Sequence, residues 1–320
     1  MINANRPFLW KEDIIKSVDL YNTWFMAFAP KAYRDTRVET TEQVQIGLES
    51  LNDLMEISPE QIIKDPSIIS VLRMCTCPPL ARDRLTGLGY LNTSIVQTLE
   101  GGNLPKRMLK DDLKKNLKSI CNIIIKLLDK DIFTWIETKK IPTKEEKHRA
   151  ATVIADRLCG AVADPIIRNS QEQRQLKVIS EYLEGKGYKR KNHPTDTPIT
   201  AMENGTYNFR MNIPVTLSNG ENTSSINIPI DVVVKKKNSE GGEYPILIEC
   251  KSAGDFTNTN KRRKEEAVKI AQLKSMYGDR INLTLFLCGY FDSGYLGYEA
   301  AEGLDWVWEH RIIDMEFLGL

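Results

Sequence analysis

The hydrophobic period of this chain changes near its midpoint, and the change limits the folds that the sequence can adopt. Before Asp164-Pro165, apolar residues recur at steps of three and four, which gives one apolar helix face. The clearest run is Leu109, Leu113, Leu117, Ile120, Ile124 and Leu127. After that pair, short runs rich in Ile, Val and Tyr alternate with Asn, Gly and Ser clusters, a pattern typical of strands and turns. We therefore predict an all-helical region over residues 1–164 and a mixed domain over residues 165–320.

Helix start and stop signals agree with this division. The stretch SPEQ, beginning at Ser58, has the form of a capping box with Pro at the first helical position. Thr143 and Glu146 form a second capping box. In the second half, residues 171–184 are predicted as a helix that ends at Gly185.

The remainder of the second half predicts a sheet flanked by helices. Strands are expected at residues 207–217, 226–235, 245–251, 283–288 and 306–308. Helices are expected at residues 265–277, in a short segment closed by residues 300–303, and at the C-terminal end. Strands and helices are interleaved, so the fold class is α+β or α/β.

Composition excludes several classes of protein. With 320 residues, 41% hydrophobic and 27% charged, the chain resembles a globular protein of about two domains. The start of the chain lacks the pattern of a signal peptide, and no apolar run approaches the ~18 residues of a membrane span. We expect a cytoplasmic protein with reduced cysteines. Cys75 and Cys77 are spaced wrongly for a zinc knuckle.

Two carboxylates and a lysine lie on neighbouring predicted strands. Asp231 is in the stretch INIPIDVVVKK, and Glu249 and Lys251 end the apolar stretch PILIECK. Glu249 and Lys251 are two residues apart, so both point to one face of a strand. A hairpin through SEGGEY would pair the two strands and bring Asp231 close to Glu249.

This combination suits phosphodiester hydrolysis. Carboxylate oxygens are ligands that Mg²⁺ prefers, and the carbonyl of Cys250 can complete such a site. Lys251 can hold and activate a water or stabilise the charge of the transition state. The alternative is an ordinary ion pair at a strand end, because an E-x-K pattern alone is common. The Cys250 side chain points to the opposite face, where we expect a buried apolar role.

The start of the next predicted helix carries cations where a stable helix favours acids. Thr257 or Thr259 can cap this helix, and four cations follow: Lys261, Arg262, Arg263 and Lys264. Cations in a first turn oppose the helix dipole by ~0.3–1 kcal/mol each, whereas a bound phosphate would reverse that sign. The alternative is a solvated basic turn offset by Glu265 and Glu266.

The sequence resembles a known group of enzymes. Its P-I-D and E-C-K elements resemble the PD-(D/E)xK nuclease superfamily, although Pro229 stands two residues before Asp231 instead of next to it. IECKS followed by TNTNKR resembles the XamI-type family of type II restriction endonucleases. CPPLARDRLTGL at residues 77–88 and DPIIRNSQEQ near residue 170 agree with that family, so the resemblance spans most of the chain.

The resemblance implies a restriction-endonuclease-like domain with a mixed central β-sheet over residues 165–320. It implies Mg²⁺-dependent cleavage of double-stranded DNA at a short specific site, and a partner DNA methyltransferase that protects the bacterial host. Asp231 and Glu249 would bind the metal, and Lys251 would be the catalytic lysine. A palindromic site would fit a homodimer.

The resemblance also implies further site residues. Glu172 would be an additional catalytic acid, or alternatively an N-terminal helix residue favoured by the dipole. Predicted DNA contacts are Asn258, Asn260, Lys261, Arg262 and Arg263. The helical region would supply further DNA or dimer contacts, and its lysines around residues 106–118 are either a solvated face or a contact to the DNA backbone.

Three other functions remain open from the sequence. The fold also suits a structure-specific DNA repair or junction-resolving nuclease, which needs no base readout. A non-catalytic DNA-binding protein would not need Asp231, Glu249 and Lys251 together. A helical interaction protein with an appended module would have no Mg²⁺ dependence.

Overall fold

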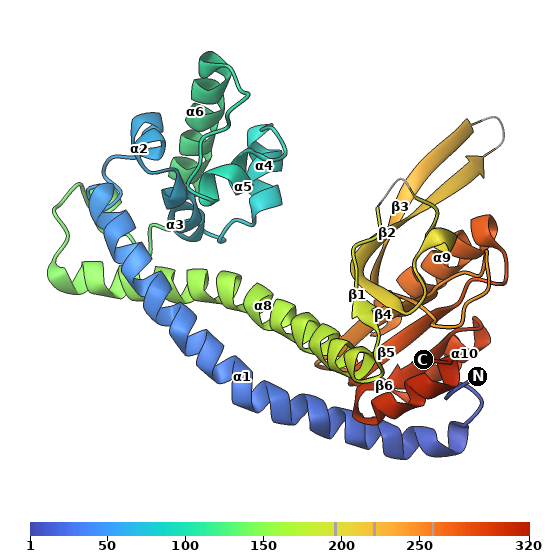
Figure 1. Cartoon of the computed structure of the whole chain (residues 1–320). Coiled ribbons are helices and arrows are strands. Elements are labelled where there is room, and N and C mark those ends of the chain that lie inside the picture. Colours follow the sequence, from blue (N-terminus) through green and yellow to red (C-terminus); the bar gives the residue numbers. More distant parts are fainter. Residues whose placement is uncertain (195–196, 220–221, 258) are drawn as a thin grey trace. The chain divides into compact units, whose positions relative to one another are not determined.

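The computed structural model describes residues 1–194, 197–219, 222–257 and 259–320. It divides into two compact units. The helical unit is residues 29–167, and the sheet unit combines residues 1–28 with residues 168–320. Each unit is described by itself (Figure 1). Asn258 lies outside the described residues, as do the side chains at seven further positions: Ser218, Asn219, Asn222, Thr223, Asn260, Lys261 and Arg262.

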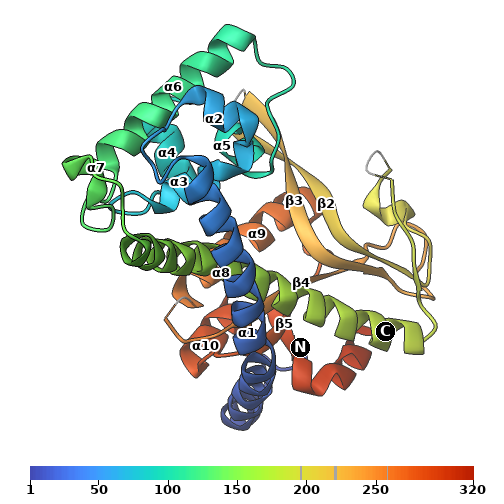
Figure 2. The same ribbon diagram turned by 90° about the vertical axis from the view of Figure 1, so that its left-hand side faces the viewer.

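The helical unit packs short helices around one amphipathic helix, as Figure 2 shows. Its helices are α2 (Pro59–Lys64), α3 (Ile69–Met74), α4 (Arg82–Gly89), α5 (Ile95–Glu100), α6 (Lys110–Leu127) and α7 (Trp135–Thr138), with parts of α1 (Pro7–Ser50) and α8 (Lys144–Gly185). The predicted apolar face of α6 is confirmed, because Leu117, Ile120 and Ile124 are fully buried in the unit's core.

The predicted capping box at Thr143 forms both of its bonds, and the one at Ser58 forms its serine bond. The Ser58 hydroxyl accepts a hydrogen bond from the backbone N–H of Gln61 at the start of α2. At the start of α8 the Glu146 carboxylate accepts from the N–H of Thr143, and the Thr143 hydroxyl accepts from the N–H of Glu146. These bonds satisfy backbone donors that the first helical turn leaves without partners.

The predicted boundary at Asp164-Pro165 does not interrupt the helix, because α8 continues across it. It runs through Pro165 as one helix, so the prediction of a separate helix over residues 171–184 was wrong about where that helix begins. A proline inside a helix costs about 3 kcal/mol. Leu158 is buried in the core of the helical unit and Leu176 in that of the sheet unit. Packing at both ends of the helix outweighs the local penalty.

The sheet unit contains a mixed sheet with strand order β1-β2-β3-β4-β5-β6. The strands are β1 (Lys189–Arg190), β2 (Thr206–Asn219), β3 (Asn222–Lys235), β4 (Ile246–Ala253), β5 (Leu283–Gly289) and β6 (Asp305–Trp308). Pairs β2–β3 and β3–β4 are antiparallel, and the others are parallel. The predicted fold class and the five predicted strands are confirmed.

Helices cover both faces of this sheet. Helix α9 (Thr259–Tyr277) packs Ile270 and Leu273 against Leu247 on one face. On the other face the end of α8 packs Leu176 and Ile179 against Ile248. Helix α10 (Ser293–Ala301) lies beside α9, and the 3₁₀ segment Glu309–Leu318 follows β6. Shorter 3₁₀ turns occur at Pro66–Ile68 and Ile199–Ala201.

The first 28 residues belong to the sheet unit, which differs from the predicted division at residue 164. The carboxylate of Asp305 accepts hydrogen bonds from the backbone N–H groups of Ile2, Asn3 and Ala4. Trp10 packs against Trp306, with ring centroids 5.5 Å apart. These contacts join residues about 300 positions apart in sequence, which helical periodicity does not reveal.

Gly289 ends β5 in a conformation that other residues rarely adopt. Its φ is +101°, and an added Cβ would lie 2.1 Å from the carbonyl oxygen of Ala253 on the adjacent strand. We predict that Gly289→Ala lowers the free energy of unfolding by about 2 kcal/mol or more. Urea denaturation measures this. The control is Gly241→Ala, where an added Cβ meets nothing within 4 Å and stability should change little; equal stability of the two variants would contradict the prediction.

Candidate active site

The antiparallel pairing of β3 with β4 stops at one position. The pairs are Val234 with Ile246, Val233 with Leu247, and Val232 with Ile248. The next pair in this register would be Asp231 with Glu249, but no backbone pairing is formed there. Beyond this point β3 continues its pairing with β2 as a long ribbon (Figure 1). The two predicted carboxylates therefore lie where neighbouring strands separate.

The face on which Glu249 and Lys251 lie follows from strand alternation. Leu247 packs in the core beneath α9, and residues two apart on a strand share a face. Glu249 and Lys251 therefore point towards α9. Cys250 packs with the core on the opposite face, as predicted. Burial raises the pKa of its thiol well above the usual value, which makes a reactive thiolate unfavourable.

The charged side chains form a connected group. Lys251 Nζ lies 3.1 Å from Glu249 Oε1 and 3.6 Å from Glu266 Oε1. Lys269 Nζ, from α9, lies 2.7 Å from the same Glu249 oxygen. The Asp231 carboxylate accepts a hydrogen bond of 2.8 Å from the backbone N–H of Cys250. The structure thus brings Asp231, Glu249 and Lys251 to one place.

Burial and charge change the proton affinity of this group. Burial, with the nearby charge of Glu249, raises the pKa of Asp231 to about 6. Burial would lower the pKa of Lys251, but the charges of Glu249 and Glu266 outweigh burial and raise it. The lysine is therefore a cation at neutral pH, and the two carboxylates repel each other.

These residues fit a divalent cation. Glu249 Oε2 is buried and has no hydrogen-bond partner among the described residues. The N–H of Cys250 points to Asp231, and in a strand the carbonyl of the same residue points to the same side. Two carboxylates and a carbonyl are hard oxygen donors. No group of three or more His, Cys, Asp or Glu side chains in the described part of the chain is placed to hold a metal.

The remaining predicted site residues have different surroundings. Glu172 forms an ion pair of 2.7 Å with Arg210, and its charge adds to the raised pKa of Asp231. It lies in the middle of α8, so the alternative of a helix N-terminus does not apply. Arg263 stacks over the ring of Tyr298 at 3.7 Å. Asn258 and the side chains of Asn260, Lys261 and Arg262 lie outside the described residues.

Sequence reasoning missed the residues that α9 and α10 add. The sequence prediction includes Glu266 only as a charge that offsets a solvated basic turn, and it does not include Lys269; in the structure Glu266 is 1% exposed. Glu266 accepts a 2.5 Å hydrogen bond from the hydroxyl of Tyr295, and Glu299 is fully buried beside them. The spacing of these residues along α9 and α10 predicts which of them share a helix face. It does not predict which face packs against β4.

The buried carboxyl of Glu299 makes stability depend on pH. Burial, together with the charge of Glu266, raises its pKa from 4.5 to about 9. Because the folded pKa is the higher one, this group's contribution is fully present below about pH 4.5 and is lost as pH rises towards 9. We predict that Glu299→Gln, which resembles the protonated form, raises Tm by a few degrees at pH 8 and has little effect at pH 4.

Thermal unfolding across pH 4 to 9 tests this expectation. Glu181→Gln on the exposed face of α8 is the control, because its side chain is 65% exposed and should show no such trend. A Glu299→Gln variant that is less stable than the wild type at pH 8 would contradict the raised pKa.

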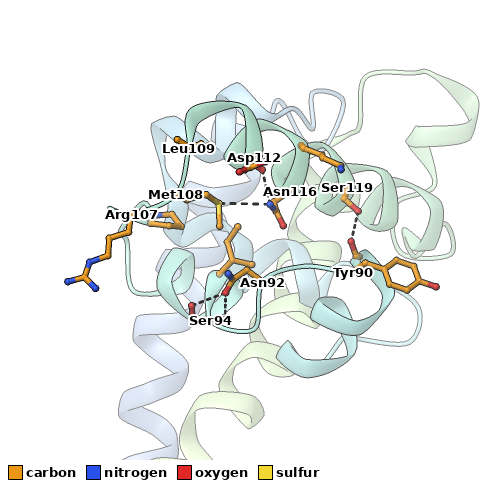
Figure 3. A pocket seen from close by; sticks show the side chains of 13 residues that line it. Tyr90, Asn92, Ser94, Arg107, Met108, Leu109, Asp112, Asn116 and Ser119 are labelled. Atoms are coloured by element: carbon orange, nitrogen blue, oxygen red, sulfur yellow. Dashed lines mark hydrogen bonds between the residues drawn. The ribbon is translucent and has the colours of Figure 1, made fainter.

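A separate hollow of about 730 Å³ lies in the helical unit. It is lined by α6 and by the connections around α4 and α5, including Asn92, Asp112 and Asn116. Figure 3 shows that the side chains of Arg107 and Tyr90 extend away from it in opposite directions. Its lining combines apolar side chains, such as Met108 and Leu109, with polar ones and the cations Arg107 and Lys115. None of the predicted catalytic residues lines this hollow.

Comparisons with known proteins show the family to which the chain belongs. A family model described as XamI restriction endonuclease matches residues 52–308. The type II restriction enzyme SalI of Streptomyces albus G is 51% identical over 319 residues, which cover 100% of both chains. No solved structure matches. No helix in the described part of the chain is long and apolar enough to cross a membrane. The chain therefore belongs to the XamI restriction endonuclease family and is a restriction enzyme.

Proposed function

We propose that the protein is a type II restriction endonuclease that hydrolyses phosphodiester bonds of double-stranded DNA at a specific site, with Mg²⁺ as cofactor. The observation that carries this proposal is the placement of Asp231, Glu249 and Lys251 where β3 and β4 separate. The resemblance to SalI over the whole chain supports the specific reaction class. Enzymes of this class generally use a divalent metal ion.

In this proposal Asp231, Glu249 and the Cys250 carbonyl hold the metal. When bound, Mg²⁺ polarises the scissile phosphate and lowers the pKa of an attacking water. The buried oxygen of Glu249 and the mutual repulsion of the two carboxylates supply the electrostatic reason for binding a cation. Glu172, close enough to influence Asp231, is the candidate for an additional acid.

Lys251 acts as a cation in this proposal. Its raised pKa makes it a poor general base at neutral pH, so it would orient the attacking water and stabilise the negative charge on the phosphate. Glu249 and Glu266 fix its ammonium from two sides. An ammonium fixed in this way loses little freedom when the transition state forms.

Partners follow from the proposed reaction. Double-stranded DNA is the substrate, and a cognate DNA methyltransferase would protect the host sites. A homodimer would place one active site on each strand of a palindromic site. The protein would work in the bacterial cytoplasm. The cations at the start of α9 and Asn258 would lie near phosphates or bases.

The helical unit offers a second surface for DNA. Lys110, Lys114 and Lys118 are exposed and recur at every fourth position of α6, so they form one cationic stripe. A stripe of this kind suits the phosphate backbone, which is recognised mainly through charge. We propose that this stripe contacts DNA outside the cleavage site.

Removing the catalytic ammonium should abolish cleavage without abolishing binding. We predict that Lys251→Ala lowers the rate of Mg²⁺-dependent DNA cleavage by at least about a hundredfold, because it removes transition-state charge stabilisation. Asp231→Asn should behave similarly and should also weaken Mg²⁺ binding. Digestion of a DNA of known sequence, followed by sequencing of the ends, measures cleavage and its specificity.

The matched control for this experiment is Lys177→Ala on α8. Lys177 is 76% exposed and pairs only with its helix neighbour Glu181 among the contacts described, so wild-type cleavage is expected. Wild-type cleavage by Lys251→Ala would exclude the proposed mechanism. Random fragments or cleavage restricted to branched DNA would exclude the proposed specificity.

Neutralising the α6 stripe should weaken DNA binding in a salt-dependent way. We predict that Lys110→Gln, Lys114→Gln and Lys118→Gln together reduce the slope of log affinity against log salt by about three, because each phosphate contact contributes about one. Fluorescence anisotropy with a labelled duplex measures this slope. Cleavage at saturating enzyme should persist.

A second triple variant controls for net charge. Lys139, Lys140 and Lys144 are also exposed in the helical unit but lie outside α6 or at the start of α8. Their replacement by Gln should leave the slope close to the wild-type value. Equal slopes for the two triple variants would show that α6 makes no particular contact.

A further inference from the structure

Two lysines from different elements meet the same oxygen of Glu249. Lys251 comes from β4, and Lys269 comes from α9, 18 residues later in the sequence. The shorter of the two contacts belongs to Lys269, at 2.7 Å. Its side chain is only 18% exposed, so the ion pair is shielded from water and is not an ordinary surface pair.

Lys269 also contacts the neighbouring strand. Its ammonium donates a hydrogen bond of 3.0 Å to the backbone carbonyl of Pro229, two residues before Asp231 on β3. One side chain therefore joins β3 to the Glu249 carboxylate of β4. This bridge lies where the backbone pairing of the two strands has stopped, so no ladder hydrogen bond fixes their separation there.

Glu266 completes the arrangement from the same helix. It precedes Lys269 by three residues, so both lie on one face of α9. Glu266 contacts Lys251, whereas Lys269 contacts Glu249. The acid and base of α9 thus pair with the base and acid of β4. The Tyr295 hydroxyl in turn holds Glu266, which ties this face of α9 to α10.

We propose that Lys269 is a positioning residue that sets the separation of Glu249 and Asp231 and so prepares this pair for a divalent cation. The inference rests on the proposed function, because it assigns a role in the same site. Lys269 acts through Glu249 and the β3 backbone and does not touch the reacting phosphate. Residues that orient metal ligands typically change metal affinity or activity by about 10–100-fold when they are replaced.

The test compares Lys269→Met with Lys269→Arg. Methionine keeps an unbranched stem but lacks the ammonium, whereas arginine keeps a cation that can donate to both acceptors. We expect Lys269→Met to raise the Mg²⁺ concentration for half-maximal cleavage by about tenfold or more. We expect Lys269→Arg to recover most of this loss. Isothermal titration with Mg²⁺ alone gives a readout that does not depend on cleavage.

A lysine elsewhere on α9 provides the control. Lys274→Met, in the last turn of the helix, should keep the wild-type Mg²⁺ dependence. Thermal unfolding shows whether each variant folds. Where Lys269→Met does not fold, Lys269→Gln replaces it, since glutamine keeps a donor but lacks the charge and length, and the same shift is expected.

The possible results separate this inference from the proposed function. Unchanged Mg²⁺ dependence in Lys269→Met would overturn the inference. Tighter Mg²⁺ binding by that variant would also overturn it, because Lys269 would then be a competitor of the metal. Absence of Mg²⁺-dependent cleavage by the wild type would instead overturn the proposed function.

Discussion

The separation of β3 from β4 after Val232 and Ile248 is the constraint on which the proposed site depends. A regular ladder would use the N–H of Cys250 to bind the backbone of β3. Here that N–H donates to the side chain of Asp231 instead. The replacement satisfies a backbone donor and fixes a carboxylate at the same time, while Glu249 on the adjacent position remains free of strand pairing to β3. A charged site forms next to the three residue pairs that join these two strands.

Helix α9 compensates for the lost pairing. Glu266 and Lys269 reach across to Lys251 and Glu249, so ion pairs and hydrogen bonds take the place of the backbone ladder. Buried pairs of this kind contribute less to stability than their charges suggest, because desolvation opposes them. These ion pairs instead fix the positions of the charged side chains, because each charge has a partner that limits its movement. Burial and, to a lesser extent, the charge of Glu249 raise the pKa of Asp231, so its ionised form is disfavoured in this site.

The sequence was sufficient for five of the six strands and for the charges that they carry, because both depend on local patterns; the two-residue strand β1 was not predicted. Alternation along β4 places Glu249 and Lys251 on one face and Cys250 on the other without any tertiary information. The partners from α9 could not be predicted, because Glu266 and Lys269 have the spacing of any exposed helical pair. Helix α8 shows the opposite failure, since Pro165 is a strong local signal that tertiary packing overrides. Residues that lie far apart in sequence, such as Asn3 and Asp305, give no local signal at all.

The hydrogen bonds to the Asp305 carboxylate limit when the sheet unit can fold during synthesis. Residues 2–4 donate to a carboxylate about 300 positions later, and the Asp13 carboxylate pairs with Arg311 at 3.0 Å. During synthesis the N-terminal segment has to wait for β6 to leave the ribosome before the sheet unit can close. Contacts of such sequence separation form late and slowly. The sheet unit of this restriction enzyme therefore cannot close until Asp305 and Arg311 have been synthesised.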